Sequence, residues 1–137
     1  MSDNVRVLRG GDTEKVTINL GYVDLGRIDL LVQEGFYSNR TDFIRTAIRG
    51  QLATHAAEVA RSVERQMLEF GLREFGVADL EAVRAAGEVL HVRVVGLARI
   101  AADVPAELAR ATIGSLTVLG ALQASPEVKA ALAGRIK

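Results

Sequence analysis

The stretch on which the fold depends is Lys15-Val16-Thr17-Ile18-Asn19-Leu20, in which every odd position is polar and every even position is apolar. Alternation with a period of two predicts a β-strand with one buried face. A single strand of six residues has unpaired edges and only half of a hydrophobic layer, so it is unstable alone. We therefore expect it to be stable only when it pairs with another strand.

Two helices are predicted directly after this strand. Residues 22–34 have apolar side chains at helical spacing, and Gly35 ends that pattern. After a turn at Phe36-Tyr37-Ser38, the run Asn39-Arg40-Thr41-Asp42 predicts an N-cap with an acid three residues later, a variant of the capping box. The second helix begins there, and its apolar stripe includes Phe43, Ile44, Ala47, Ile48 and Leu52.

The remainder of the chain is predicted to be a helical connection followed by a smaller unit of strands and helices. Apolar residues continue at spacings of three and four from Leu52 to Phe70, which predicts a long amphipathic helix. Residues 71–88 are expected to continue this connection, with a short helix at 79–86. Residues 89–95 are rich in β-branched side chains, which favours a strand.

A weak internal repeat is found in the C-terminal part. A shift of 24 positions aligns Val94 with Val118 and Gly96 with Gly120, so each copy is expected to be a strand, a glycine turn and a short helix. Chance similarity in a segment rich in Ala, Leu and Val is the alternative. Because two copies rarely bury a core, we expect this part to be completed in an oligomer.

The composition excludes several classes of site. The chain has no cysteine, which rules out disulfides and thiolate chemistry, and its two histidines, His55 and His91, are far apart. We expect no metal, no cofactor and no enzymatic activity, since no nucleophile, base and phosphate loop occur at recognisable spacing. No apolar run is long enough to span a membrane, and we expect a cytoplasmic, nucleoid-associated protein.

The formal net charge is zero, whereas binding to DNA usually depends on Lys and Arg. Residues 1–52 contain seven acids and seven bases, so the overall balance does not decide the question. What matters is whether the bases gather on one side. Arg6 and Arg9 in the N-terminal arm could contact phosphate, or could belong to a solvated terminus.

The order of strand, helix, glycine turn and capped helix resembles the ribbon-helix-helix DNA-binding family, in particular its CopG-like members. The strand at 15–20 is similar to the family's N-terminal strand, and residues 35–49, Gly-Phe-Tyr-Ser-Asn-Arg-Thr-Asp-Phe-Ile-Arg-Thr-Ala-Ile-Arg, are similar to its turn and second helix. Asn39, Thr41 and Asp42 replace more common residues of comparable chemistry, and Gly21-Tyr22 stands where many members have proline. The resemblance ends near residue 52.

The resemblance implies that two strands form an intermolecular antiparallel ribbon in the DNA major groove. Its base-reading side chains would be Lys15, Thr17 and Asn19. The start of the second helix would bind a backbone phosphate through Asn39, Arg40 and Thr41. The residues expected in the dimer core are Val16, Ile18, Leu20, Ile44 and Ile48.

The expected fold is therefore α+β, in four parts. These are a flexible arm at 1–14, a ribbon-helix-helix module at 15–52, a helical connector at 53–88, and a C-terminal oligomerisation or effector unit at 89–137. The preferred function is a homodimeric, sequence-specific DNA-binding repressor that assembles into tetramers or larger species through residues 53–137. The alternatives are an antitoxin that masks a toxin partner and a DNA-organising assembly protein.

Overall fold

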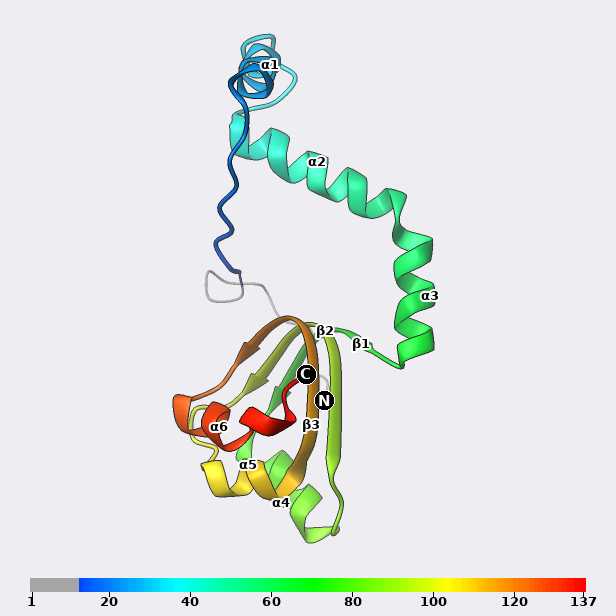
Figure 1. Cartoon of the computed structure of the whole chain (residues 1–137), viewed down its shortest axis with the longest axis vertical. Helices are drawn as coiled ribbons and strands as arrows, with labels where there is room; N and C mark the ends of the chain where they lie inside the picture. Colours follow the sequence, from blue (N-terminus) through cyan, green and yellow to red (C-terminus); the bar gives the residue numbers. More distant parts are fainter. Residues whose placement is uncertain (1–12) are drawn as a thin grey trace. The chain divides into compact units, whose positions relative to one another are not determined.

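The computed structural model describes residues 13–137, which fold into two units (Figure 1). Residues 13–62 form the N-terminal unit, and residues 63–137 belong to the C-terminal unit. Most of the predicted flexible arm, with Arg6 and Arg9, lies outside the described residues. Strands and helices are both present, so the α+β class predicted from the sequence is confirmed.

Two helices of the N-terminal unit have ends that follow the sequence signals. Helix α1 (Tyr22–Gln33) ends in a Schellman motif: Gly35 has φ +88° and donates to Val32, while Phe36 donates to Leu31. Helix α2 (Arg40–Thr54) begins at Asn39, whose side-chain oxygen accepts from the Asp42 N–H at 2.8 Å. Both predicted helices and the predicted N-cap are confirmed.

The segment at 15–20 has no strand partner among the described residues. Its apolar side chains are open to solvent, with exposed fractions of 76% for Val16, 62% for Ile18 and 37% for Leu20. A β-ladder requires a second strand, and one chain supplies none here. The intermolecular ribbon thus remains a prediction.

The predicted long helix is shorter than expected. Helix α3 (Ala56–Gln66) ends before Met67, which has a left-handed φ of +55°, and strand β1 (Glu69–Phe75) follows. The prediction of a helical connection over residues 71–75 was therefore wrong, as was the extension of the amphipathic helix to Phe70. The charged sequence of β1 lacks strand-like alternation, and it becomes a strand through its ladder with a neighbouring strand.

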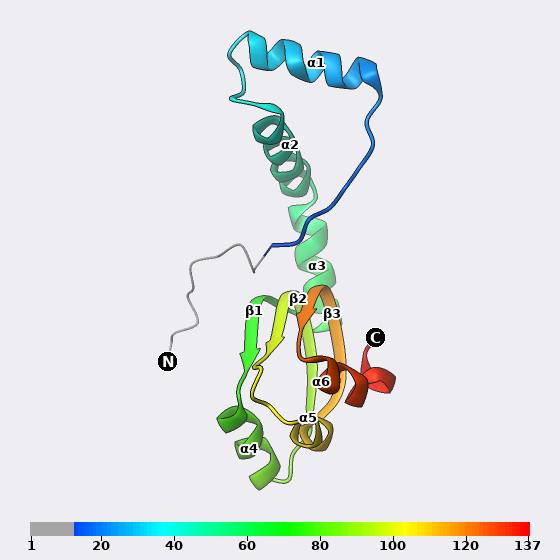
Figure 2. The same cartoon turned by 90° about the vertical axis from the view of Figure 1, so that its left-hand side faces the viewer.

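The C-terminal unit is a three-stranded parallel sheet in the order β1-β2-β3, with helices between and after the strands (Figure 2). Helix α4 (Val77–Ala85) leads to β2 (Leu90–Ile100), and α5 (Ala106–Thr112) leads to β3 (Ile113–Gln123). Helix α6 (Pro126–Ala131) and the short 3-10 helix η2 (Ala133–Arg135) close the chain. The predicted short helix at 79–86 and the predicted strand at 89–95 correspond to α4 and β2.

The core of this unit lies between one face of the sheet and the helices. Alternate residues of β2 are buried, and they pack with helix residues such as Leu80, Leu108 and Val128. The opposite face of the sheet includes Phe70 and Leu119, which are both exposed. Parallel strands need a crossover for each pairing, and the helices supply it while covering a single face.

Three glycines lie at the same level of the three strands. Gly71 is paired with Gly96, and Gly96 with Gly120, and all three have positive φ. The internal repeat in the sequence matched Gly96 with Gly120 at a shift of 24 positions but missed Gly71, which precedes Gly96 by 25 positions. The glycines lie within the strands and do not form the turns that were expected there.

In the part of the chain that the structure describes, no helix is long and apolar enough to cross a membrane.

Candidate nucleic-acid interface

The predicted base-reading residues all lie on the exposed segment before α1. Lys15, Thr17 and Asn19 are solvent-exposed and follow one another at every second position. An extended chain places such residues on one side. Their side chains therefore remain available for contacts outside the chain.

The N-terminus of α2 is held in shape by two reciprocal hydrogen bonds. Asn39 Oδ1 accepts from the Asp42 backbone N–H at 2.8 Å, and the Asp42 carboxylate accepts from the Ser38 N–H at 2.9 Å. The first N–H groups of a helix have no acceptor within the helix, and the helix dipole makes this end positive. A negatively charged group is favoured at such a helix end.

A shallow hollow of about 360 Å³ lies at this helix end. It is lined by Ser38, Asn39, Thr41, Asp42, Arg45 and Arg49. The two arginines are one helical turn apart, and neither has an ion pair among the described residues. Neither arginine was predicted as a site residue, although their spacing of four was the signal that could have identified them.

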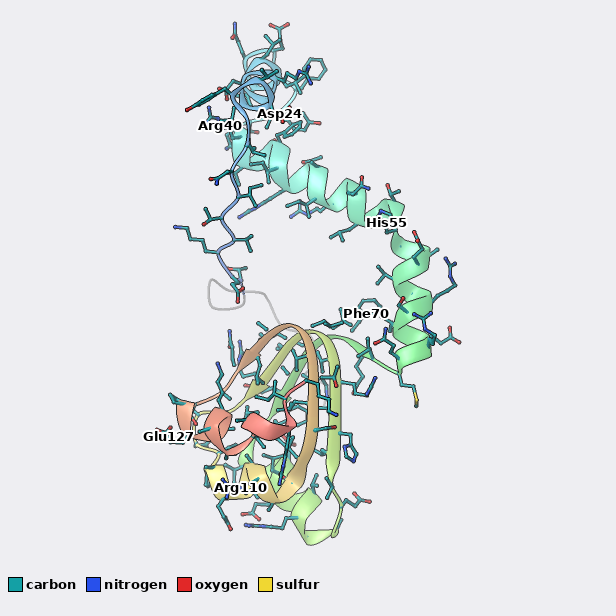
Figure 3. All side chains as sticks on the ribbon, in the orientation of Figure 1. Asp24, Arg40, His55, Phe70, Arg110 and Glu127 are labelled. Atoms are coloured by element: carbon teal, nitrogen blue, oxygen red, sulfur yellow. The ribbon has the colours of Figure 1, made fainter. Side chains whose placement is uncertain are left out.

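Arg40, a predicted phosphate ligand, points elsewhere and is already paired. The guanidinium of Arg40, which is labelled in Figure 3, donates from Nε and Nη2 to the two carboxylate oxygens of Asp29 on α1, each at 2.8 Å. This hydrogen bond, more than the charge attraction that accompanies it, lowers the pKa of Asp29 and raises that of Arg40. The pair links α1 to α2, and Arg40 does not line the hollow.

An apolar groove of about 390 Å³ runs between the exposed segment and helices α1 and α2. Four of the five residues predicted for the dimer core line it, and Val16 does not. Ile28, with 5% of its surface exposed, is the one buried apolar residue in the unit's helices. In a single chain this groove is exposed to water. Its apolar side chains are shielded from water only when another apolar surface covers them.

The described residues contain no group of three or more His, Cys, Asp and Glu side chains that could hold a metal ion. His55 interacts with Glu58 and Gln51 beside the α2–α3 junction, and His91 lies 2.9 Å from the Ser115 hydroxyl. His55 lies in the N-terminal unit, whereas His91 hydrogen-bonds to a residue of the neighbouring strand in the C-terminal unit.

The chain belongs to the ribbon-helix-helix transcriptional regulator family, whose model matches residues 11–129. The match therefore continues well past residue 52, where the resemblance was expected to end, and includes the C-terminal sheet. Membership defines the class of the protein, a DNA-binding transcriptional regulator. Neither curated proteins nor solved structures gave a match.

Proposed function

We propose that this protein is a homodimeric, sequence-specific DNA-binding repressor. The observation that carries the proposal is the open apolar surface of the N-terminal unit, formed by the alternating segment at 15–20 and the groove beside it. A second chain would pair its own segment antiparallel and insert Val16, Ile18 and Leu20 between the helices. Ile44 and Ile48, from α2, would complete this dimer core.

Pairing two segments would place six polar side chains on the outer face of the ribbon, three from each chain. Lys15 can donate to guanine, and Asn19 can form two hydrogen bonds with adenine. Thr17 can offer its hydroxyl or pack its methyl group on thymine. These chemistries make the ribbon suited to reading base edges in the major groove.

The start of α2 would then receive a backbone phosphate. Asn39, Arg40 and Thr41 supply N–H groups and the positive end of the helix. Arg45 and Arg49 line the same hollow and add positive charge, which helps a chain whose net charge is zero. Arg40 contributes through its backbone, because its side chain is paired with Asp29.

The test is fluorescence-polarisation binding to the DNA upstream of the protein's own gene, at several salt concentrations. The K15A/T17A/N19A variant, checked to be folded and dimeric, is compared with the wild type and with K129A, which removes an exposed lysine from α6. We expect saturable, salt-dependent binding by the wild type and K129A only. Equal binding by all three proteins, or binding by none, would contradict the proposed ribbon mechanism.

The phosphate hollow leads to a separate prediction. The R45A/R49A variant should bind specific and unrelated DNA more weakly by a similar factor, because phosphate contacts do not depend on sequence. The slope of log affinity against log salt concentration should be less negative by about one for each phosphate that the variant no longer neutralises. An unchanged slope would show that these arginines do not contact phosphate.

The C-terminal unit is proposed to join dimers so that they occupy neighbouring half-sites. Its packed sheet and buried core differ from the short polar tails that fold only on a toxin, which makes the antitoxin alternative less favoured. A DNA-organising assembly protein would form an open series of oligomers instead of a closed one.

A further inference from the structure

Strand β1 is an edge of the C-terminal sheet whose outer side has no partner strand among the described residues. It pairs only with β2. The opposite edge of the sheet, on β3, already has a short bridge between Leu116 and Ile136, and Lys137 donates to Leu116 at 2.8 Å. Exposed strand edges readily pair with another strand.

A groove of about 670 Å³ runs along β1 and is lined by residues 69–74 together with Gly76, Asp79 and Ala101. Phe70, labelled in Figure 3, has 61% of its surface exposed, and Leu72 is half-buried beside it on the same face. Edge strands that remain unpaired usually avoid large apolar side chains. An exposed phenylalanine on β1 thus favours an edge that is covered.

The charges of β1 are arranged symmetrically about its glycine. Glu69 and Arg73 lie two positions before and after Gly71, on the same face, and within one chain their side chains are 3.8 Å apart. If a second β1 ran antiparallel about a two-fold axis at Gly71, Glu69 would lie opposite the partner's Arg73. Phe70 would lie opposite the partner's Leu72, and each of these contacts would occur twice.

The neighbouring symmetric registers match the charges less well. An axis at Phe70 would place the two Phe70 rings opposite each other, but Glu69 would lie opposite the partner's Gly71, so no opposite charges would face each other. An axis at Leu72 would place Glu74 opposite the partner's Phe70, which pairs a charge with an aromatic ring. An axis at Arg73 would place two arginines opposite each other, and like charges in that position destabilise a sheet. Of these four registers, only the one centred on Gly71 places opposite charges opposite each other and also pairs apolar residues.

We propose that β1 pairs antiparallel, about Gly71, with β1 of a second copy of this chain, so that two three-stranded sheets become one six-stranded sheet. The stoichiometry rests on the proposed function, because the ribbon is proposed to join two chains already. Edge pairing between such dimers gives a dimer of dimers.

Native mass spectrometry of the full chain, with charge reversals, tests the pairing. The wild type is expected to be a tetramer, and E69R or R73E alone should raise its dimer–tetramer dissociation constant by about tenfold or more, because like charges then face each other. An equimolar mixture of E69R and R73E restores both opposite-charge pairs and should restore the tetramer. K129E, a reversal on α6, should have no effect.

A cysteine experiment covers the case in which the two chains of one ribbon dimer pair their β1 strands with each other, so that no tetramer forms. The chain has no cysteine, so F70C and L72C variants have no background thiols. Directly opposite residues of antiparallel strands are close enough for a disulfide. After mixing and mild oxidation, F70C with L72C should give a covalent dimer in a non-reducing gel, and F70C alone should give much less.

Three results would overturn the proposal: no disulfide in the mixture, single charge reversals that leave a wild-type tetramer intact, or a concentration-dependent ladder of ever larger species. The last would indicate head-to-tail pairing of β1 with β3. Failure of the ribbon mechanism can be told apart from failure of the β1 pairing. If the ribbon mechanism fails, K15A/T17A/N19A retains DNA binding, whatever oligomers E69R and R73E form.

Discussion

At the scale of single residues, the glycines of the sheet are the positions least tolerant of change. A methyl group added to Gly96 would run into the backbone carbonyl oxygen of Gly71, and one added to Gly120 into that of Gly96. Both residues also have a φ that side-chain-bearing residues rarely adopt, +139° and +121°. The sheet can form only because neither position has a Cβ.

We therefore expect G96A and G120A each to lower the free energy of unfolding by about 3 kcal/mol, combining backbone strain with the clash. The matched control is G134A, since a Cβ there meets no atom within 4 Å. It should change the free energy of unfolding by roughly 0.5 kcal/mol or less. Urea denaturation monitored by circular dichroism measures all three, and equal losses would contradict the steric explanation.

The Asp29–Arg40 pair predicts that the stability of the folded protein depends on pH. Because Arg40 lowers the pKa of Asp29 in the folded state, the pair stabilises the protein above the ordinary carboxyl pKa of about 3.9. That contribution is lost as pH falls through the lowered pKa. The side chains are about half exposed, so we expect D29N to reduce the melting temperature only slightly at pH 7.

The difference between wild type and D29N should disappear as the solution is acidified below about pH 4. E34Q, which neutralises an exposed acid at the C-terminal end of the same helix, is the control. A difference that stays constant throughout the acidification would mean that Asp29 acts other than through its charge.

At the scale of secondary-structure elements, the start of α2 depends on its cap. Replacing Asn39 with alanine removes the acceptor for the Asp42 N–H and should cost about 1 kcal/mol of stability. N39S keeps a capping oxygen and should retain most of it. Thermal unfolding at fixed protein concentration distinguishes the two variants, and equal destabilisation would show that capping is not the role of this side chain.

The elements also show where sequence patterns succeed. Helices α1 and α2 have a local cap or stop signal, in Gly35 and Asn39, and both were predicted. Strand β1 has no such local signal, since its alternating pattern is interrupted by Gly71 and charges occupy both faces. Its conformation depends on pairing with β2, which is remote in the sequence.

At the scale of the whole molecule, the two units differ in how much core each chain supplies. The C-terminal unit buries thirteen core residues within one chain, whereas the N-terminal unit buries little besides Ile28. If a second chain completes the N-terminal unit, its folding is coupled to association. The C-terminal unit should then stay folded when that association is prevented.

I18D tests this, because it places a charge on the apolar face of the predicted ribbon. We expect the variant to lose dimerisation through the ribbon and much of the helical signal of α1 and α2. Amide hydrogen exchange in β2 and β3 should remain slow. The control is T17D, which adds the same charge to the polar face, and a collapse of protection in the sheet of I18D would contradict the independence of the units.

The sequence by itself determined the features that depend on neighbouring residues. These are the alternating segment at 15–20, the two helices with their caps, and the class of the protein. Local hydrogen bonds and side-chain periodicity suffice for them, because the interacting groups are close together along the chain.

Only the tertiary structure decided that residues 69–75 form a strand and that three glycines, Gly71, Gly96 and Gly120, lie at one level of a sheet. It also decided that Arg40 is bound to Asp29. Arg45 and Arg49, in contrast, line the hollow. Each of these depends on groups that are 11 to 25 residues apart, or on which face of a helix another element covers. Such contacts have no local signature in the sequence, because they are set by packing and not by periodicity.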